Sequence, residues 1–141
     1  MKTAETAYED LCYYTLSLGD TYFIHQHVVD AYAAQNASQS DKPIRLTSAL
    51  VGLYLSVEKE FSGREVQAAH MKLAKTKQRW PSFEIPSHRG EITAVEVEMA
   101  SPGEERERMI RAWCKSVWTA YDIHKSTIDA LVQPFLPSAS H

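Results

Sequence analysis

The sequence predicts an all-α fold, a single-domain helical bundle of about five helices with one long ordered loop. Apolar residues recur every three or four positions through most of the 141 residues, which is the spacing of helices with one buried face. Turn-forming Gly, Pro and Asn residues separate these periodic segments, and no segment shows the alternation typical of a half-buried strand. We therefore expect residues 1–141 to form one α-helical domain.

The composition is that of a globular protein. Hydrophobic residues make up 44% of the chain, and 15 basic against 18 acidic residues give a net charge of −3. This balance provides no general attraction to nucleic acid or anionic lipid. No apolar run approaches the roughly 18 residues of a membrane span, the first residues are too polar for a signal peptide, and the two cysteines form no disulfide framework. We expect a cytoplasmic protein that binds neither nucleic acid nor membrane.

Four helices are expected in the first half of the chain, over residues 3–17, 23–35 and 43–61 and from residue 62 onward. Gly19 is a C-terminal stop for the first helix, and Asp20 is a candidate N-cap for the second. The third helix is apolar on two stripes, which predicts a central position in the bundle. Ser62 and Glu65 have the spacing of a capping box, which predicts the start of the fourth helix.

The second half begins with an irregular segment over residues 78–91, where prolines exclude a helix and apolar side chains are expected to pack on the bundle. A capping box of Thr93 and Glu96 predicts a short helix. Ser101 followed by proline and acidic residues predicts the N-cap of a last, long helix that ends near Val132. Residues 133–141 are expected to form a frayed tail.

Inward-pointing polar residues are the main chemical signal, since no phosphate loop, dinucleotide fingerprint, nucleophile elbow or zinc-type spacing occurs. Bundles build metal sites from imidazoles and carboxylates on facing helices, and two imidazoles with one carboxylate suit a divalent metal such as zinc or iron. The candidate metal ligands are His27, Asp30, Glu58 and His70, with His25 and His124 as alternates.

Other roles for these residues stay open. They can form a purely structural hydrogen-bond network in which Asp30 or Glu58 holds His27. They can also carry out metal-free acid–base chemistry, with the pKa of Glu58 or Asp30 raised by burial. A further alternative is a non-enzymatic binding or oligomerisation module with edge aromatics, among them Trp118 as cover for the irregular segment or as partner surface. A homo-oligomer and an unidentified small-molecule ligand are the partners that these alternatives allow.

The second helix also carries a family-like pattern: His25, Val29, Asp30, Tyr32 and Gln35 at fixed spacing. This pattern resembles a bacterial family described only as domain of unknown function 5946. The similarity covers about residues 8–132, through positions 42–44, 50–55, 58, 62–67, 70–71, 80–81, 113 and 117–118.

The resemblance implies no activity, but it marks His25, Asp30, Tyr32 and Gln35 as the family's positions on this helix. The family often has His-Pro after the glutamine, where this chain has Asn-Ala, so the role of that second imidazole is absent here. The helical periodicity favours His27 as the partner of Asp30, whereas the resemblance favours His25, and both remain candidates.

Overall fold

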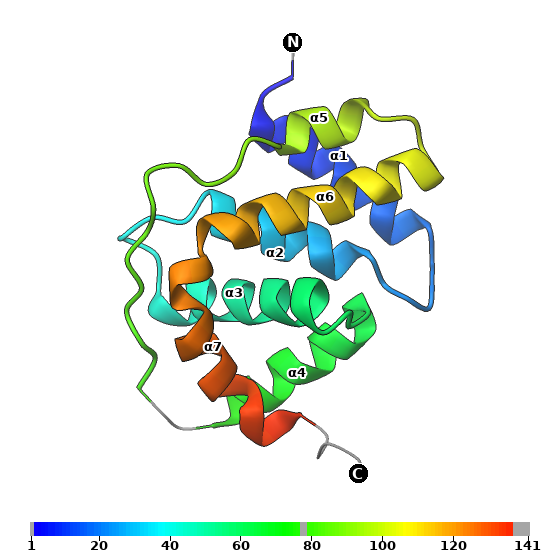
Figure 1. The fold of residues 1–141 in the computed structure, drawn as a ribbon. Coiled ribbons are helices and arrows are strands. Elements are labelled where there is room, and N and C mark those ends of the chain that lie inside the picture. Colours follow the sequence, from blue (N-terminus) through cyan, green and yellow to red (C-terminus); the bar gives the residue numbers. More distant parts are fainter. Residues whose placement is uncertain (1, 77–78, 137–141) are drawn as a thin grey trace.

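The structure, a computed structural model, describes residues 2–76 and 79–136. The regular structure in these residues is helical throughout, so the all-α prediction is confirmed, but the number of helices was underestimated. Figure 1 shows the arrangement. The α-helices are α1 (Ala4–Ser17), α2 (His25–Gln35), α3 (Pro43–Glu58), α4 (Gly63–Lys75), α5 (Ala94–Met99), α6 (Glu104–Ala120) and α7 (Lys125–Val132), and the short 3₁₀ helices are η1 (Asp122–His124) and η2 (Gln133–Phe135).

Helix α3 lies at the centre of the bundle, as its two apolar stripes predict. Every residue from 49 to 55 is buried, and the helix contacts α2, α4, α6 and α7. Figure 1 shows α1 and α5 side by side at one end of the molecule, α4 and α7 toward the other, and α2, α3 and α6 between them. Burial on all sides of α3 follows from this arrangement, because a helix that is apolar nearly all round must be covered.

Local capping signals place several helix starts correctly. Ser62 accepts a hydrogen bond from the Glu65 N–H while the Glu65 carboxylate accepts one from the Ser62 N–H, and Thr93 and Glu96 form the same reciprocal box. Both boxes satisfy backbone N–H groups that have no partner inside the helix. Asp20 is not the N-cap of α2, but its carboxylate accepts from the Ile24 N–H at 3.0 Å and so holds the turn before that helix.

The last helix departs from prediction at both ends. It starts at Glu104, after Gly103 with φ of 104°, and Ser101 does not cap it. The expected continuous helix to Val132 breaks at Tyr121, whose fully buried hydroxyl donates to the Ala34 carbonyl at 2.6 Å. No Gly or Pro marks this break in the sequence. Tyr121 is the C-cap of α6, and its bond to a distant helix accompanies a local interruption that periodicity alone does not reveal.

The segment over residues 79–93 is irregular, as expected, and packs on the bundle through its apolar side chains. The Arg89 guanidinium donates to the carbonyls of Gln35 and Ala37 at 3.0 and 2.7 Å, at the last residue of α2 and just beyond it. These bonds satisfy carbonyls that a helix end leaves without partners. Residue 78 and the tail residues 137–141 lie outside the described part of the chain, whereas the start of the expected frayed tail forms η2.

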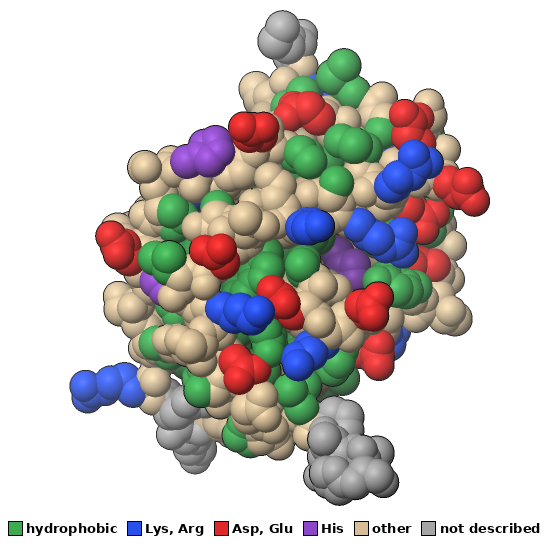
Figure 2. Space-filling model, viewed as in Figure 1, with side chains coloured by type: hydrophobic (Ala, Val, Ile, Leu, Met, Phe, Trp, Pro, Cys, Tyr) green, Lys and Arg blue, Asp and Glu red, His purple; other side chains and the backbone are tan. Residues whose placement is uncertain are grey.

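Figure 2 shows acidic, basic and hydrophobic side chains interspersed over the visible face. None of the helices within residues 2–76 and 79–136 is both long and apolar enough to cross a lipid bilayer.

Candidate functional site

The structure divides the predicted site residues between several places. Asp30 and His70 lie close together in the interior, His27 lines a separate pocket, and the other three candidates bond elsewhere. Within the described ranges, no group of three or more His, Cys, Asp or Glu side chains is arranged to hold a metal ion.

Asp30 is 3% exposed and lies between α2 and α3. Its Oδ1 accepts a hydrogen bond from the Gln26 amide at 3.2 Å, whereas its buried Oδ2 has no partner among the described residues. A Cβ atom added at Gly52 would overlap with the carboxylate, so the absence of a side chain at Gly52 makes room for it. Burial raises the pKa of Asp30 well above its ordinary value, because desolvation disfavours the charged form.

His70 approaches Asp30 from α4. Its Nε2 lies 3.9 Å from Asp30 Oδ1 but only 2.7 Å from the Ser48 carbonyl oxygen. The Nε2–H group therefore donates to Ser48, because a carbonyl can only accept. Burial lowers the pKa of His70, so the uncharged imidazole is favoured. The structure thus brings together two of the four principal candidates, without a direct hydrogen bond between them.

Glu58 is not an inward-pointing carboxylate, which corrects the sequence interpretation. It is the last residue of α3 and is exposed, and its oxygens accept from the Trp118 indole N–H at 2.9 Å and from Lys125 Nζ at 3.2 Å. These bonds, with Trp118 the larger cause, lower the pKa of Glu58 rather than raising it. Trp118 is itself 2% exposed and is part of the core, not cover for the irregular segment.

The alternates also have structural partners. His25 Nδ1 lies 2.9 Å from the Thr15 hydroxyl, and His124 Nε2 lies 2.7 Å from the Glu84 carbonyl oxygen. Neither imidazole reaches the Asp30 cluster. Each joins two segments of the chain, α1 to α2 in one case and the irregular segment to η1 in the other.

Two further family-like positions on α2 serve the packing. The Gln35 side chain accepts from the Trp113 indole at 2.9 Å and donates to the Ile92 carbonyl at 2.7 Å. The Tyr32 ring stacks on Tyr8 with centroids 3.8 Å apart. A hydrogen-bonded, half-buried amide of this kind helps to fix the relative positions of the elements it joins.

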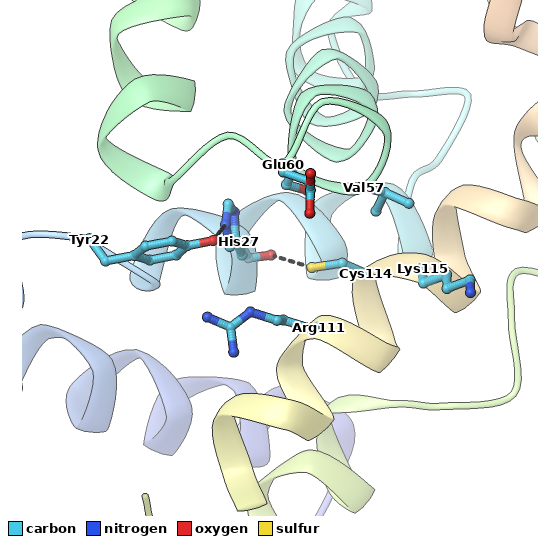
Figure 3. Close-up of a pocket in the computed structure, with 8 residues that line it drawn as sticks. Tyr22, His27, Val57, Glu60, Arg111, Cys114 and Lys115 are labelled. Atoms are coloured by element: carbon cyan, nitrogen blue, oxygen red, sulfur yellow. Dashed lines mark hydrogen bonds between the residues drawn. The ribbon is translucent and has the colours of Figure 1, made fainter. Parts of the chain in front are cut away.

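His27 lines a pocket of about 380 Å³ that sequence analysis did not identify. Figure 3 shows the pocket between α2, the end of α3, α6 and the segment before α2. Its walls carry cations, an acid, a phenol and a thiol. The lining residues are Tyr22, His27, Ser56, Val57, Glu60, Arg111, Cys114 and Lys115.

The imidazole of His27 is 2% exposed, and its Nε2 lies 3.0 Å from the Tyr22 hydroxyl. Burial, and secondarily the charge of Arg111, lowers the pKa of His27 to about 4, so the ring is neutral at pH 7. Its Nδ1 is buried without a hydrogen-bond partner among the described residues. A buried N–H without a partner is rarer in proteins than an acceptor without one, so we place the proton on Nε2 and the bare lone pair on Nδ1.

This tautomer decides the role of Tyr22. If His27 Nε2–H donates to the Tyr22 oxygen, the phenolic proton points elsewhere. The Phe61 carbonyl oxygen can accept this proton, but it lies 3.5 Å from the Tyr22 oxygen, which is long for an O–H···O bond. Tyr22 therefore offers a hydrogen-bond donor to a ligand in the pocket, and the bond that it accepts from His27 polarises it.

Arg111 and Lys115 supply positive charge from one face of α6, since they are four residues apart. The guanidinium group lies 5.5 Å from the centroid of the Tyr22 ring, and neither cation forms an ion pair within the described structure. Cys114 donates to the His27 carbonyl, with Sγ 3.5 Å from the oxygen, and burial raises its pKa. The thiol is thus protonated and is not a nucleophile at neutral pH.

Four residues of this pocket were not predicted from the sequence: Tyr22, Glu60, Arg111 and Lys115. The spacing of the two cations on the last helix was a readable signal, because residues four apart share a helix face. The approach of Tyr22 was not readable, since it depends on the turn before α2 and on its contact with the start of α4, where the Arg64 N–H donates to the Tyr22 carbonyl at 3.0 Å.

A model described as "Family of unknown function (DUF5946)" matches residues 4–122, which agrees with the resemblance seen in the sequence. No curated protein and no solved structure matches the chain.

Proposed function

The chain belongs to the family of unknown function DUF5946, whose description assigns no activity, and from the geometry of the pocket we propose that it binds a small anionic ligand between α2, α3 and α6. The observation that carries this proposal is that three residues whose donors lack strong partners line one cavity. Arg111 and Lys115 approach from α6, and the Tyr22 hydroxyl approaches from the turn before α2.

The chemistry of these groups favours an oxyanion. A guanidinium can form two parallel hydrogen bonds to a carboxylate or phosphate, and hydrogen bonds to charged groups contribute about 1.5–3 kcal/mol each. The pocket volume of about 380 Å³ lies within the usual range for small-molecule sites. A small carboxylic acid or phosphate monoester has the required charge and size.

Calorimetric titration with inorganic phosphate and with succinate tests this proposal. We expect saturable binding of at least one anion, weakened about tenfold or more in Arg111→Gln because one charged hydrogen bond is lost. The matched control is Arg108→Gln, since Arg108 is exposed on the same helix and does not line the pocket. Absence of saturable binding, or equal weakening by both substitutions, would contradict the proposal.

A metal-binding role is a second candidate, supported by one observation: the buried Asp30 Oδ2 has no partner in the described structure and His70 lies nearby. Here Asp30 would supply an oxygen ligand and His70 a nitrogen ligand. The His70 ring would first have to rotate away from the Ser48 carbonyl that its Nε2–H group now bonds. Elemental analysis of protein never exposed to chelator tests this role. Stoichiometric zinc or iron that disappears in Asp30→Ala but persists in His124→Ala would support it. Protein without stoichiometric metal would rule it out.

A further inference from the structure

Glu60 occupies an unusual backbone position at the rim of the same pocket. It follows the C-terminal end of α3 with φ of 57°, in the left-handed region. Glycine is the common residue at such a position, because it has no Cβ to clash with the backbone, and glutamate is not favoured there. The Phe61 N–H donates to the Leu55 carbonyl at 3.0 Å and closes the helix end around this conformation.

The carboxylate of Glu60 has no hydrogen bond or ion pair within residues 2–76 and 79–136. Glu58, two residues earlier, is held by Trp118 and Lys125. The two glutamates at this helix end therefore differ: Glu58 joins α3 to α6 and α7, whereas Glu60 contributes no such contact to the fold. Figure 3 shows the Glu60 side chain directed from the end of α3 toward the space that Arg111 borders from α6.

A carboxylate at this place opposes the binding of a simple anion. It lines the same cavity as Arg111 and Lys115, and like charges repel across a pocket of this size. Its effect becomes favourable only when the ligand also carries a positive group. The walls then match a dipolar molecule, with the oxyanion toward the cations of α6 and the positive group toward the end of α3.

We propose that the ligand is dipolar, an oxyanion that also bears an ammonium group, and that Glu60 recognises the ammonium group. This inference rests on the anion-binding function proposed above and adds the second end of the ligand. An amino acid and an amino-alcohol phosphate share this chemistry. The carboxylate and phosphate versions differ only in the group that faces Arg111 and Lys115.

The test uses two matched pairs of probes in NMR titrations of the purified chain. γ-Aminobutyrate is compared with butyrate, and phosphoethanolamine with ethyl phosphate, so each pair differs by one ammonium group. We expect the wild-type chain to prefer the ammonium member of at least one pair by about fivefold, the upper range for an ion pair at an exposed site. The pair that shows the preference identifies the oxyanion as carboxylate or phosphate.

Two substitutions remove the carboxylate in different ways. Glu60→Gln keeps the size of the side chain, and Glu60→Gly also relieves the left-handed backbone. In both variants the ratio of the two affinities within a probe pair should fall to about one, because the ammonium member binds more weakly. Glu60→Gly should in addition unfold at a higher temperature than the wild type, which shows that lost preference is not caused by poor folding.

Glu91→Gln is the matched control, because Glu91 is exposed and does not line this pocket. It should leave the preference unchanged. The inference is overturned if Arg111-dependent binding is present but Glu60→Gln leaves the preference as in the wild type, or if the wild type has no preference. Binding that does not depend on Arg111 would instead overturn the anion-binding proposal, and the role of Glu60 with it.

Discussion

His27 and Asp30 lie three residues apart on α2, and burial shifts their pKa values in opposite directions. The pKa of His27 falls to about 4, and that of Asp30 rises well above its ordinary value. In each case the cause is desolvation, which favours the uncharged form. The two side chains nevertheless serve different places, since His27 bonds Tyr22 at the pocket and Asp30 packs against Gly52.

The shifted pKa of His27 predicts a loss of stability in acid. The unfolded chain binds a proton on this imidazole below about pH 6.5, whereas the folded chain does so only below about pH 4. Titration of His27 should therefore lower the free energy of unfolding by up to about 3 kcal/mol as the pH drops from 6.5 to 4, whereas the raised pKa of Asp30 acts in the opposite direction over this range.

Urea denaturation at pH 7 and pH 4.5 measures this effect. Relative to the wild type, His27→Gln should lose less stability between pH 7 and pH 4.5, because the pKa shifts of His25, His70 and Asp30 are shared by both chains and only that of His27 is removed. His88→Gln, at an exposed loop position, should behave as the wild type does. A pH difference that His27→Gln leaves unchanged would show that this imidazole is not neutral in the folded chain.

Gly52 gives a second prediction at this scale. Gly52→Ala should destabilise the chain by about 1–3 kcal/mol, because the new methyl group would overlap with the Asp30 carboxylate. The single variants Gly52→Ala and Asp30→Ala and the double variant form a cycle of unfolding free energies. The double variant should be more stable than the sum of the single effects implies, and simple additivity would argue against the contact.

At the scale of elements, the start of α4 packs against the turn before α2, which carries the pocket residue Tyr22. Phe23 adopts a positive φ of 61°, and its carbonyl oxygen lies where a Cβ at Gly63 would be. The Arg64 guanidinium covers the Phe23 ring at 4.5 Å from the centroid. The close approach of the Phe23 backbone to Gly63 therefore fixes the turn that carries Tyr22.

Gly63→Ala should displace this turn, because the added methyl group would meet backbone and not a flexible side chain. We expect lower stability, by about 1–3 kcal/mol, together with weaker phosphate binding as Tyr22 moves. Thermal unfolding and calorimetry measure the two effects. Ala68→Ser, at an exposed position on α4, is the control. If a folded Gly63→Ala chain binds phosphate as tightly as the wild type does, the position of this turn does not determine anion binding.

The element boundaries also show what the sequence can predict. Both capping boxes mark helix starts correctly, because their hydrogen bonds lie within four residues of chain. The break at Tyr121 was missed, since it coincides with a bond to Ala34 on another helix. Glu58 was misplaced for a similar reason: α3 ends there, and Trp118 and Lys125 hold the carboxylate at the surface.

At the scale of the whole molecule, the burial of His27 and Asp30 could be predicted from the sequence, whereas the residues that lie next to them could not. Periodicity correctly placed His27 and Asp30 in the interior, because one helix face determines burial. It could not tell that they face different neighbours, which depends on how α3, α4 and α6 cross α2. The pocket combines residues from four separate segments, and only the pair on α6 was visible in sequence. Metal binding and homo-oligomerisation stay predictions.

Titration of isotope-labelled protein with phosphate and with succinate, followed by amide NMR shifts, tests the anion site most directly. We expect saturable shifts with at least one of the two anions, clustered at residues 22, 27, 60, 111 and 115, and a midpoint about tenfold higher or more in Arg111→Gln. Shifts that saturate with neither anion, that lie elsewhere on the bundle, or that have the same midpoint in Arg111→Gln would contradict an anion site between α2, α3 and α6.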